Sequence, residues 1–147
     1  MKIHHPHGSK ERLFEMMIRV NKLDEQEYSE DKRRVIVDDF INYVSEQLGL
    51  ENIPEVELLY NEGIAQNMKS FGGYNPQTKK IVVVATNRNL ADMLRTIAHE
   101  LIHRKQDEEG ILKSDSGETG SEEENEANAQ AGVFMRDYSK NNPNIFE

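Results

Sequence analysis

Two histidines, His99 and His103, stand four residues apart in a segment with strong helical periodicity. The periodicity predicts a helix from about Leu90 to Glu108, with an asparagine cap before it and Gly110 as its terminator. On such a helix the two histidines project about 40° apart and away from the apolar arc, so both imidazoles can converge on one ion. This spacing is typical of a zinc site, and it constrains the fold more than any other feature of the chain.

Glu100 directly follows the first histidine and adds a proton-transfer group to the same helix. A carboxylate at this position can take a proton from a metal-activated water that attacks a carbonyl carbon, and can later protonate the leaving amine. The pattern therefore indicates hydrolysis of peptide bonds without a covalent nucleophile. The competing interpretation is a polar helix face with two exposed histidines, which so short a pattern leaves open.

The composition limits what the third metal ligand can be. The chain has no cysteine, which excludes disulfides, thiolate zinc sites and cysteine nucleophiles. The only other histidines are His4, His5 and His7, in an N-terminal tail whose metal role is left open. The third ligand is therefore expected to be acidic. The candidates that follow the motif are Asp115, Glu118, Glu122, Glu123, Glu124 and Glu126.

A second helix, expected from about residue 121 to residue 138, selects among these carboxylates. Ala127 and Ala131 share a face with Glu124, and two small residues there would let this helix approach the motif helix closely. Asn128 lies one turn beyond Glu124 and could accept a hydrogen bond from a ligating imidazole. Glu124 is therefore the predicted third ligand. The alternative is a capping box, in which Glu124 turns back to the start of its own helix.

The preceding residues favour an α+β fold with a small, mostly antiparallel sheet. A helix is expected from about Glu30 to Leu48, followed by a strand that begins near Val56. A hairpin is expected over residues 71–85, with its turn at 75–78 and a β-branched strand at 80–85.

The combination of a hairpin, the His99-Glu100-Leu101-Ile102-His103 helix and a helix carrying Glu124-Asn125-Glu126-Ala127-Asn128 resembles the gluzincin metallopeptidases. Within that group it is similar to the minigluzincins and to the ImmA/IrrE-type peptidases, over roughly residues 56–138. It also resembles small zincin-like proteins of tailed bacteriophages. Metzincins fit less well, because their pattern requires glycine and histidine where this chain has Gln106 and Glu109. SprT-type zincins use a third histidine after the motif, and none follows His103.

The resemblance implies a minimal zincin fold in which the sheet packs on the motif helix. It implies Zn²⁺ on His99, His103 and Glu124, with Glu100 as the general base and Asn128 beside a ligand. It also implies that an extended substrate adds to an edge strand, expected here at Ile81, Val82, Val83 and Val84. The group that stabilises the oxyanion is left open among Tyr60, Tyr74 and Arg136.

Length and charge bound the organisation and the partners. At 147 residues we expect one peptidase-like domain at 30–147, preceded by an extension at 1–29. An amphipathic helix at 10–23 would dock on the domain or on a protein partner. The net charge of −9 argues against nucleic acid, and no apolar run approaches the roughly 20 residues of a membrane span. The N-terminus lacks a secretory signal, so the expected location is cytoplasmic, or the virion if the protein is encoded by a phage.

Two functions therefore fit the sequence. The first is a zinc metallopeptidase that acts on a protein or peptide substrate. The second is a zinc-binding structural or partner-binding protein, such as a phage particle component, that keeps the site without turnover.

Overall fold

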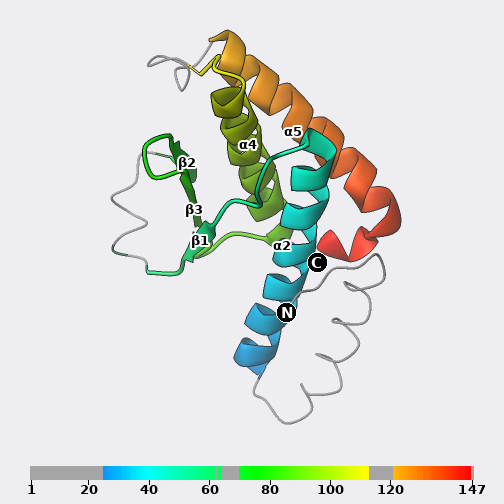
Figure 1. Ribbon diagram of the computed structural model, residues 1–147. Helices are drawn as coiled ribbons and strands as arrows, with labels where there is room; N and C mark the ends of the chain where they lie inside the picture. Colours follow the sequence, from blue (N-terminus) through cyan, green and yellow to red (C-terminus); the bar gives the residue numbers. More distant parts are fainter. Residues whose placement is uncertain (1–24, 62, 64–69, 113–120, 147) are drawn as a thin grey trace. The chain divides into compact units, whose positions relative to one another are not determined.

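The computed structural model describes residues 25–61, 63, 70–112 and 121–146. The chain divides into two compact units, residues 1–42 and 43–147, and all the candidate site residues described below belong to the second. Figure 1 shows the described elements, and together they make an α+β fold, as expected. They are α2 (Glu25–Leu48), β1 (Val56–Leu59), β2 (Gly72–Asn75), β3 (Lys80–Val84), α4 (Leu90–Glu108), α5 (Glu122–Asn141) and a 3-10 helix, η1 (Pro143–Ile145).

Helix α2 begins five residues before the expected start at Glu30 and ends at Leu48, as predicted. Gly49 follows with a φ of +69°, a left-handed conformation that glycine adopts without strain. The expected apolar face is buried, as Val37, Phe40 and Val44 show. The predicted domain boundary at residues 29 and 30 falls inside this helix. The expected helix at 10–23 and the three N-terminal histidines lie outside the described residues.

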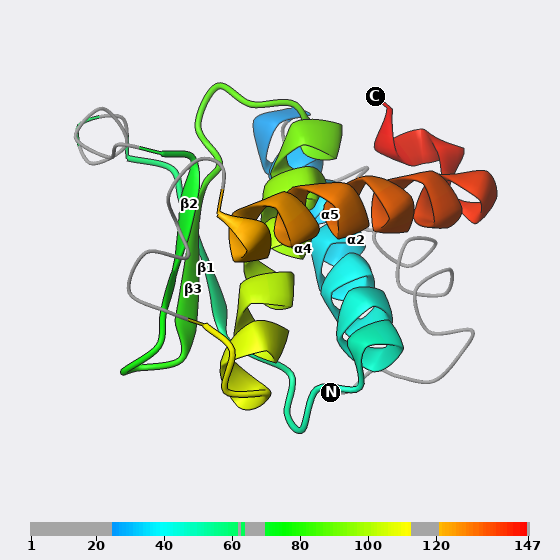
Figure 2. The same ribbon diagram turned by 90° about the horizontal axis from the view of Figure 1, so that it is seen from above.

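The sheet is mixed rather than mostly antiparallel. Its strand order is β1-β3-β2, with β1 parallel and β2 antiparallel to β3 (Figure 2). The β2–β3 pair is the expected hairpin, and the Asn75 side chain accepts hydrogen bonds from the amides of Gln77 and Thr78 in its turn. Alternating apolar residues predict a strand without predicting its direction, and β1 reaches β3 from the side that the hairpin leaves open.

The expectation of an open edge at Ile81–Val84 is wrong, because β3 is the central strand. Val82 is paired with Glu57 on one side and with Gly73 on the other. With both edges of β3 occupied, no substrate strand can add to it. The physical reason lies in its apolar run, since a nearly continuous β-branched segment suits the middle of a sheet better than its edge.

Helix α4 occupies the predicted residues and packs against β2, β3 and α5. Asn89 caps it by accepting a hydrogen bond from the amide of Asp92 at 2.9 Å. Helix α5 starts after Ser121 and ends at Asn141, three residues later than expected. Its alanines Ala127 and Ala131 are fully buried, which allows the close approach to α4 that their size predicted.

The far end of α5 has a structural role. Tyr138 is buried, and its ring lies 5.3 Å from that of Tyr43, which also meets Phe134 edge to face. Within the part of the chain that the structure describes, no helix is long and apolar enough to cross a lipid bilayer.

Candidate metal centre

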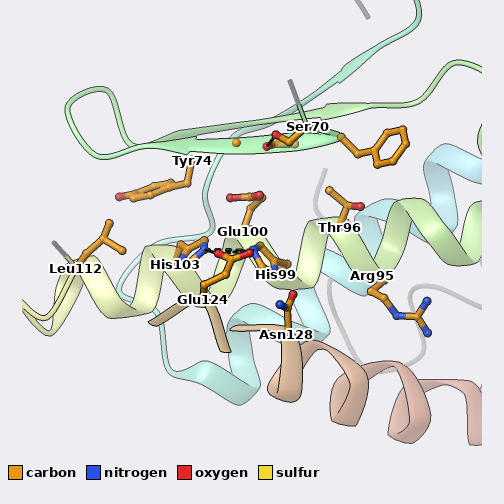
Figure 3. Close-up of a pocket in the computed structure, with 13 residues that line it drawn as sticks. Ser70, Tyr74, Arg95, Thr96, His99, Glu100, His103, Leu112, Glu124 and Asn128 are labelled. Carbon is orange, nitrogen blue, oxygen red and sulfur yellow. Dashed lines mark hydrogen bonds and ion pairs between the residues drawn. The ribbon is translucent and has the colours of Figure 1, made fainter. Parts of the chain in front are cut away.

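Three side chains from two helices converge on one point. The Nε2 atoms of His99 and His103 on α4 lie 3.2 Å apart. Each also lies 3.1 Å from a carboxylate oxygen of Glu124 on α5 (Figure 3). The structure therefore brings together the two motif histidines and the one carboxylate that helix periodicity selected among six.

The spacing of these atoms fits a tetrahedral zinc site. Zinc bonds to nitrogen and oxygen of about 2.0–2.1 Å with tetrahedral angles would hold neighbouring ligand atoms roughly 3.3 Å apart. The two Nε2 atoms lie 3.2 Å apart, and they lie 3.2 and 3.1 Å from the same Glu124 oxygen, Oε1. Two imidazoles and one carboxylate would leave a fourth position open on a bound zinc ion, as in catalytic rather than structural zinc sites.

The electrostatics of the pair of helices also suit a cation. Burial is the main cause that lowers the pKa of His99, and the nearby Glu124 carboxylate opposes it. A lowered pKa keeps this imidazole neutral at physiological pH, as metal ligation requires. Asn128, one turn beyond Glu124, lines the same cavity beside His99 (Figure 3), and its side chain also acts against the lowering of the His99 pKa.

Glu100 occupies the space between α4 and the sheet. It is only 6% exposed, and Figure 3 shows its carboxyl group directed towards β2, beside the two histidines. Burial, and then the charge of Glu124, raise the pKa of Glu100 to about 8. The carboxyl groups of Glu100 and Glu124 thus lie in one buried region, and only that of Glu124 faces both histidines.

A cavity of about 450 Å³ opens over this group between α4, α5 and β2. One wall is formed by residues 70–74, and α4 contributes Arg95 and Thr96 beside the motif residues. Gly72 lets the strand come close to α4, because a Cβ atom there would lie 2.6 Å from Cγ2 of Thr96. The cavity wall therefore brings β2, which has a single strand partner among the described residues, beside the Glu100 carboxyl.

His103 is held from behind by a glutamine on its own helix. Its Nδ1 lies 2.8 Å from Oε1 of Gln106, which is 1% exposed. The amide nitrogen of Gln106 donates hydrogen bonds to the Glu123 carbonyl at 3.0 Å and to Glu126 Oε1 at 2.6 Å. Gln106 thus connects a candidate metal ligand on α4 to the first turn of α5.

Of the three residues considered for stabilising the oxyanion, the cavity lining contains one, Tyr74. Tyr60 and Arg136 are not among the described residues of the cavity wall. The Tyr74 hydroxyl donates a 2.6 Å hydrogen bond to Asp107, and Figure 3 shows it pointing away from the ligand atoms. Burial, followed by this hydrogen bond, raises the pKa of Tyr74 to about 12. In this conformation the phenol proton is donated to Asp107 and not to the site of the candidate ligands.

Sequence reasoning missed three contributors to the site. Gln106 served only to argue against metzincins, although a residue three positions after His103 faces the same side of the helix. The pair Gly72-Gly73 within a strand was a signal of close backbone approach. Thr96, one turn before Glu100, carried no chemical signal of its own. The acidic candidates Asp115 and Glu118 lie outside the described residues.

Comparisons of the chain with models of protein families, with curated proteins and with solved structures give no significant match. The resemblance to gluzincins therefore depends on the motif residues and on the arrangement of their side chains.

Proposed function

We propose that this protein is a zinc-dependent metallopeptidase of the gluzincin type, with a minimal zincin fold. The observation that carries the proposal is the convergence of His99, His103 and Glu124, whose ligand atoms lie at the mutual distances of a tetrahedral site. A chance cluster of exposed polar residues would not have these distances together with partial burial and an adjacent cavity.

The chain's own residues supply the remaining chemistry. A zinc ion held by the three side chains would act as a Lewis acid and make hydroxide available near neutral pH. Glu100 is the proton carrier, because its carboxyl lies beside the ligands and faces the cavity rather than joining the ligand group.

The substrate backbone is assigned to the outer edge of β2, in place of the edge of β3. Among the described residues β2 has one strand partner, β3, and residues 70–74 form the cavity wall. An extended peptide that pairs with β2 would pass Gly72 and Gly73, where no side chain blocks the main chain. Main-chain pairing tolerates many substrate sequences, which suits a protein or peptide substrate.

The alternative function is a zinc-binding structural or partner-binding protein, such as a phage particle component, without turnover. One observation favours it: the only tyrosine among the described residues of the cavity wall has its hydroxyl bound to Asp107. A site without an oxyanion donor would bind zinc and hydrolyse slowly or not at all.

The test separates metal binding from turnover. We expect the purified protein to contain about one zinc per chain by elemental analysis, and His99→Ala and His103→Ala to lose it. Glu100→Gln should keep zinc and the fold but abolish cleavage of a peptide library, because an amide cannot accept the proton. Glu124→Ala should likewise lose zinc. Its matched control is Glu123→Ala, which should keep zinc, since both carboxylates lie in the first turn of α5.

Two results would contradict parts of the proposal. Stoichiometric zinc in both histidine variants would remove the metal centre. Zinc that is bound normally, with no cleavage of any library peptide by the wild type, would leave the non-catalytic alternative as the function.

A further inference from the structure

The side chain of Gln106 is buried, polar and bonded at both ends, yet it takes no part in the chemistry described above. Its amide has one acceptor atom and one donor group, and the surroundings decide which atom points where. Nε2 lies 3.0 Å from the Glu123 carbonyl oxygen and 2.6 Å from Glu126 Oε1, and both of these atoms only accept. Turning the amide over would place its oxygen against two acceptors, so Oε1 must face His103.

This orientation determines where the proton of His103 resides. Oε1 of Gln106 lies 2.8 Å from Nδ1 of His103, and an oxygen that only accepts requires a proton on that nitrogen. In the neutral ring the lone pair is then on Nε2, the atom that lies 3.1 Å from Glu124 and 3.2 Å from His99. The opposite tautomer would set Nδ1 against Oε1 of Gln106, two acceptors at a buried position with no donor between them, whereas with the proton on Nδ1 the lone pair of Nε2 faces the same point as the ligand atoms of His99 and Glu124.

The same side chain also acts on the other helix. Through the Glu123 carbonyl, Gln106 is bound to the backbone directly beside Glu124. The amide of Gln106 therefore contacts one candidate ligand, His103 on α4, and the residue next to another, Glu124 on α5. We propose that Gln106 is the positioning residue of this centre: it sets the Nδ1–H tautomer of His103 and docks the first turn of α5.

This inference relies on the proposed zinc site for its purpose, although its first test needs no metal. In the ¹⁵N-labelled, metal-free protein, long-range ¹H–¹⁵N spectra of the neutral His103 ring should show the proton on Nδ1. A proton on Nε2 in the wild type would overturn the proposal, whether or not the protein binds zinc. Absence of zinc binding in the wild type would instead overturn the proposed function.

Variants then measure the consequence for the metal. Gln106→Leu keeps a similar volume but removes both hydrogen-bonding groups, and we expect zinc affinity to fall about 10- to 100-fold with loss of the single tautomer. Gln106→Glu keeps an acceptor for His103 and loses the donor to α5, so it should retain the Nδ1–H tautomer with weakened zinc binding. This second variant distinguishes the two actions of the amide.

Gln130→Leu is the matched control, because Gln130 also donates an amide hydrogen bond to Glu126, at 3.2 Å, but has no hydrogen bond to a candidate ligand among the described residues. Its zinc affinity should stay within about twofold of the wild type. Circular dichroism establishes that each variant is folded. A folded Gln106→Leu variant with wild-type zinc affinity and an unchanged His103 tautomer would contradict the proposal, and if that variant does not fold, the wild-type spectrum and Gln106→Glu still decide it.

Discussion

At the scale of single residues, Gly72 and Gly73 are neighbours in β2 with opposite tolerance for a side chain. A Cβ at Gly72 would meet Cγ2 of Thr96 at 2.6 Å and the Val82 carbonyl oxygen at 3.1 Å, whereas a Cβ at Gly73 would have nothing within 4 Å. The first glycine is therefore required by packing of the strand on α4. The second is free to change, which makes the pair an internal comparison.

We predict that Gly72→Ala lowers the free energy of unfolding by about 1–3 kcal/mol, because the added methyl overpacks a buried contact. It should also weaken zinc binding, since β2 must move away from α4 beside Glu100. Gly73→Ala should leave both quantities near their wild-type values. Urea unfolding and zinc titration of the two variants make the comparison, and equal losses in both would show that close approach is not the reason for Gly72.

At the scale of elements, the start of α5 determines where Glu124 lies. The Ser121 hydroxyl accepts a hydrogen bond from the amide of Glu124 at 3.1 Å, which caps the helix one turn before the ligand carboxylate. The sequence left open whether Glu124 would turn back to its own helix start. In the structure its carboxylate oxygens lie 3.1 Å from both imidazoles, so the cap orients the backbone while the side chain faces α4.

Ser121→Ala should lower the free energy of unfolding by about 1 kcal/mol, the usual effect of losing an N-cap. Zinc affinity should fall with it, because the first turn of α5 frays at Glu124. Ser139→Ala is the control, as this hydroxyl donates only to the Arg136 carbonyl within the same helix in the described contacts. Changes of equal size in unfolding and zinc titration for both variants would rule out the capping effect.

At the scale of the whole molecule, one hydrogen-bonded group fastens the hairpin to the end of α4. Tyr74 donates to Asp107 at 2.6 Å, and Lys79 lies 3.2 Å from the same carboxylate oxygen. The hydrogen bond from Tyr74 is the main cause that lowers the pKa of Asp107 below 3.8, with Lys79 adding to it. The pKa of Tyr74 is raised from 10.0 to about 12, first by burial and then by Asp107.

The pKa shifts of Asp107 and Tyr74 predict that the fold loses stability at low pH and at high pH, respectively. Because the pKa of Asp107 is lowered in the folded state, its contribution is present above about pH 3.8 and is lost as the pH falls through the folded value. The raised pKa of Tyr74 makes its contribution complete below pH 10.0, and that contribution is lost as the pH rises through about 12. Tyr74→Phe should flatten both limbs in urea unfolding across this pH range, and an unchanged profile would contradict the link.

Much of the site could be predicted from local periodicity. The limits of α4, its asparagine cap, the pairing of His99 with His103 and the choice of Glu124 all follow from angles around a helix, which depend on residues within a few turns. Ala127 and Ala131 likewise indicated the close packing of α5 on α4.

Contacts between distant segments could not be predicted in the same way. The apolar run at Ile81–Val84 indicated a strand, but only assembly of the sheet shows that β1 and β2 occupy both of its edges. The Tyr74 hydroxyl was open to several roles until the fold placed Asp107 beside it. The partner of a strand edge or a side-chain donor is chosen by hydrogen bonds between segments far apart in the chain.

The groups able to bind a cation, and the helix faces on which they lie, could thus be read from the chain alone, because ligand chemistry and helical angles are local properties. The packing of separate elements was needed to show that β2, and not β3, borders the cavity, and that Gln106 is hydrogen bonded both to His103 and to the backbone of α5. Those features arise when separate elements pack together, and buried donors and acceptors must then find partners that no single segment contains.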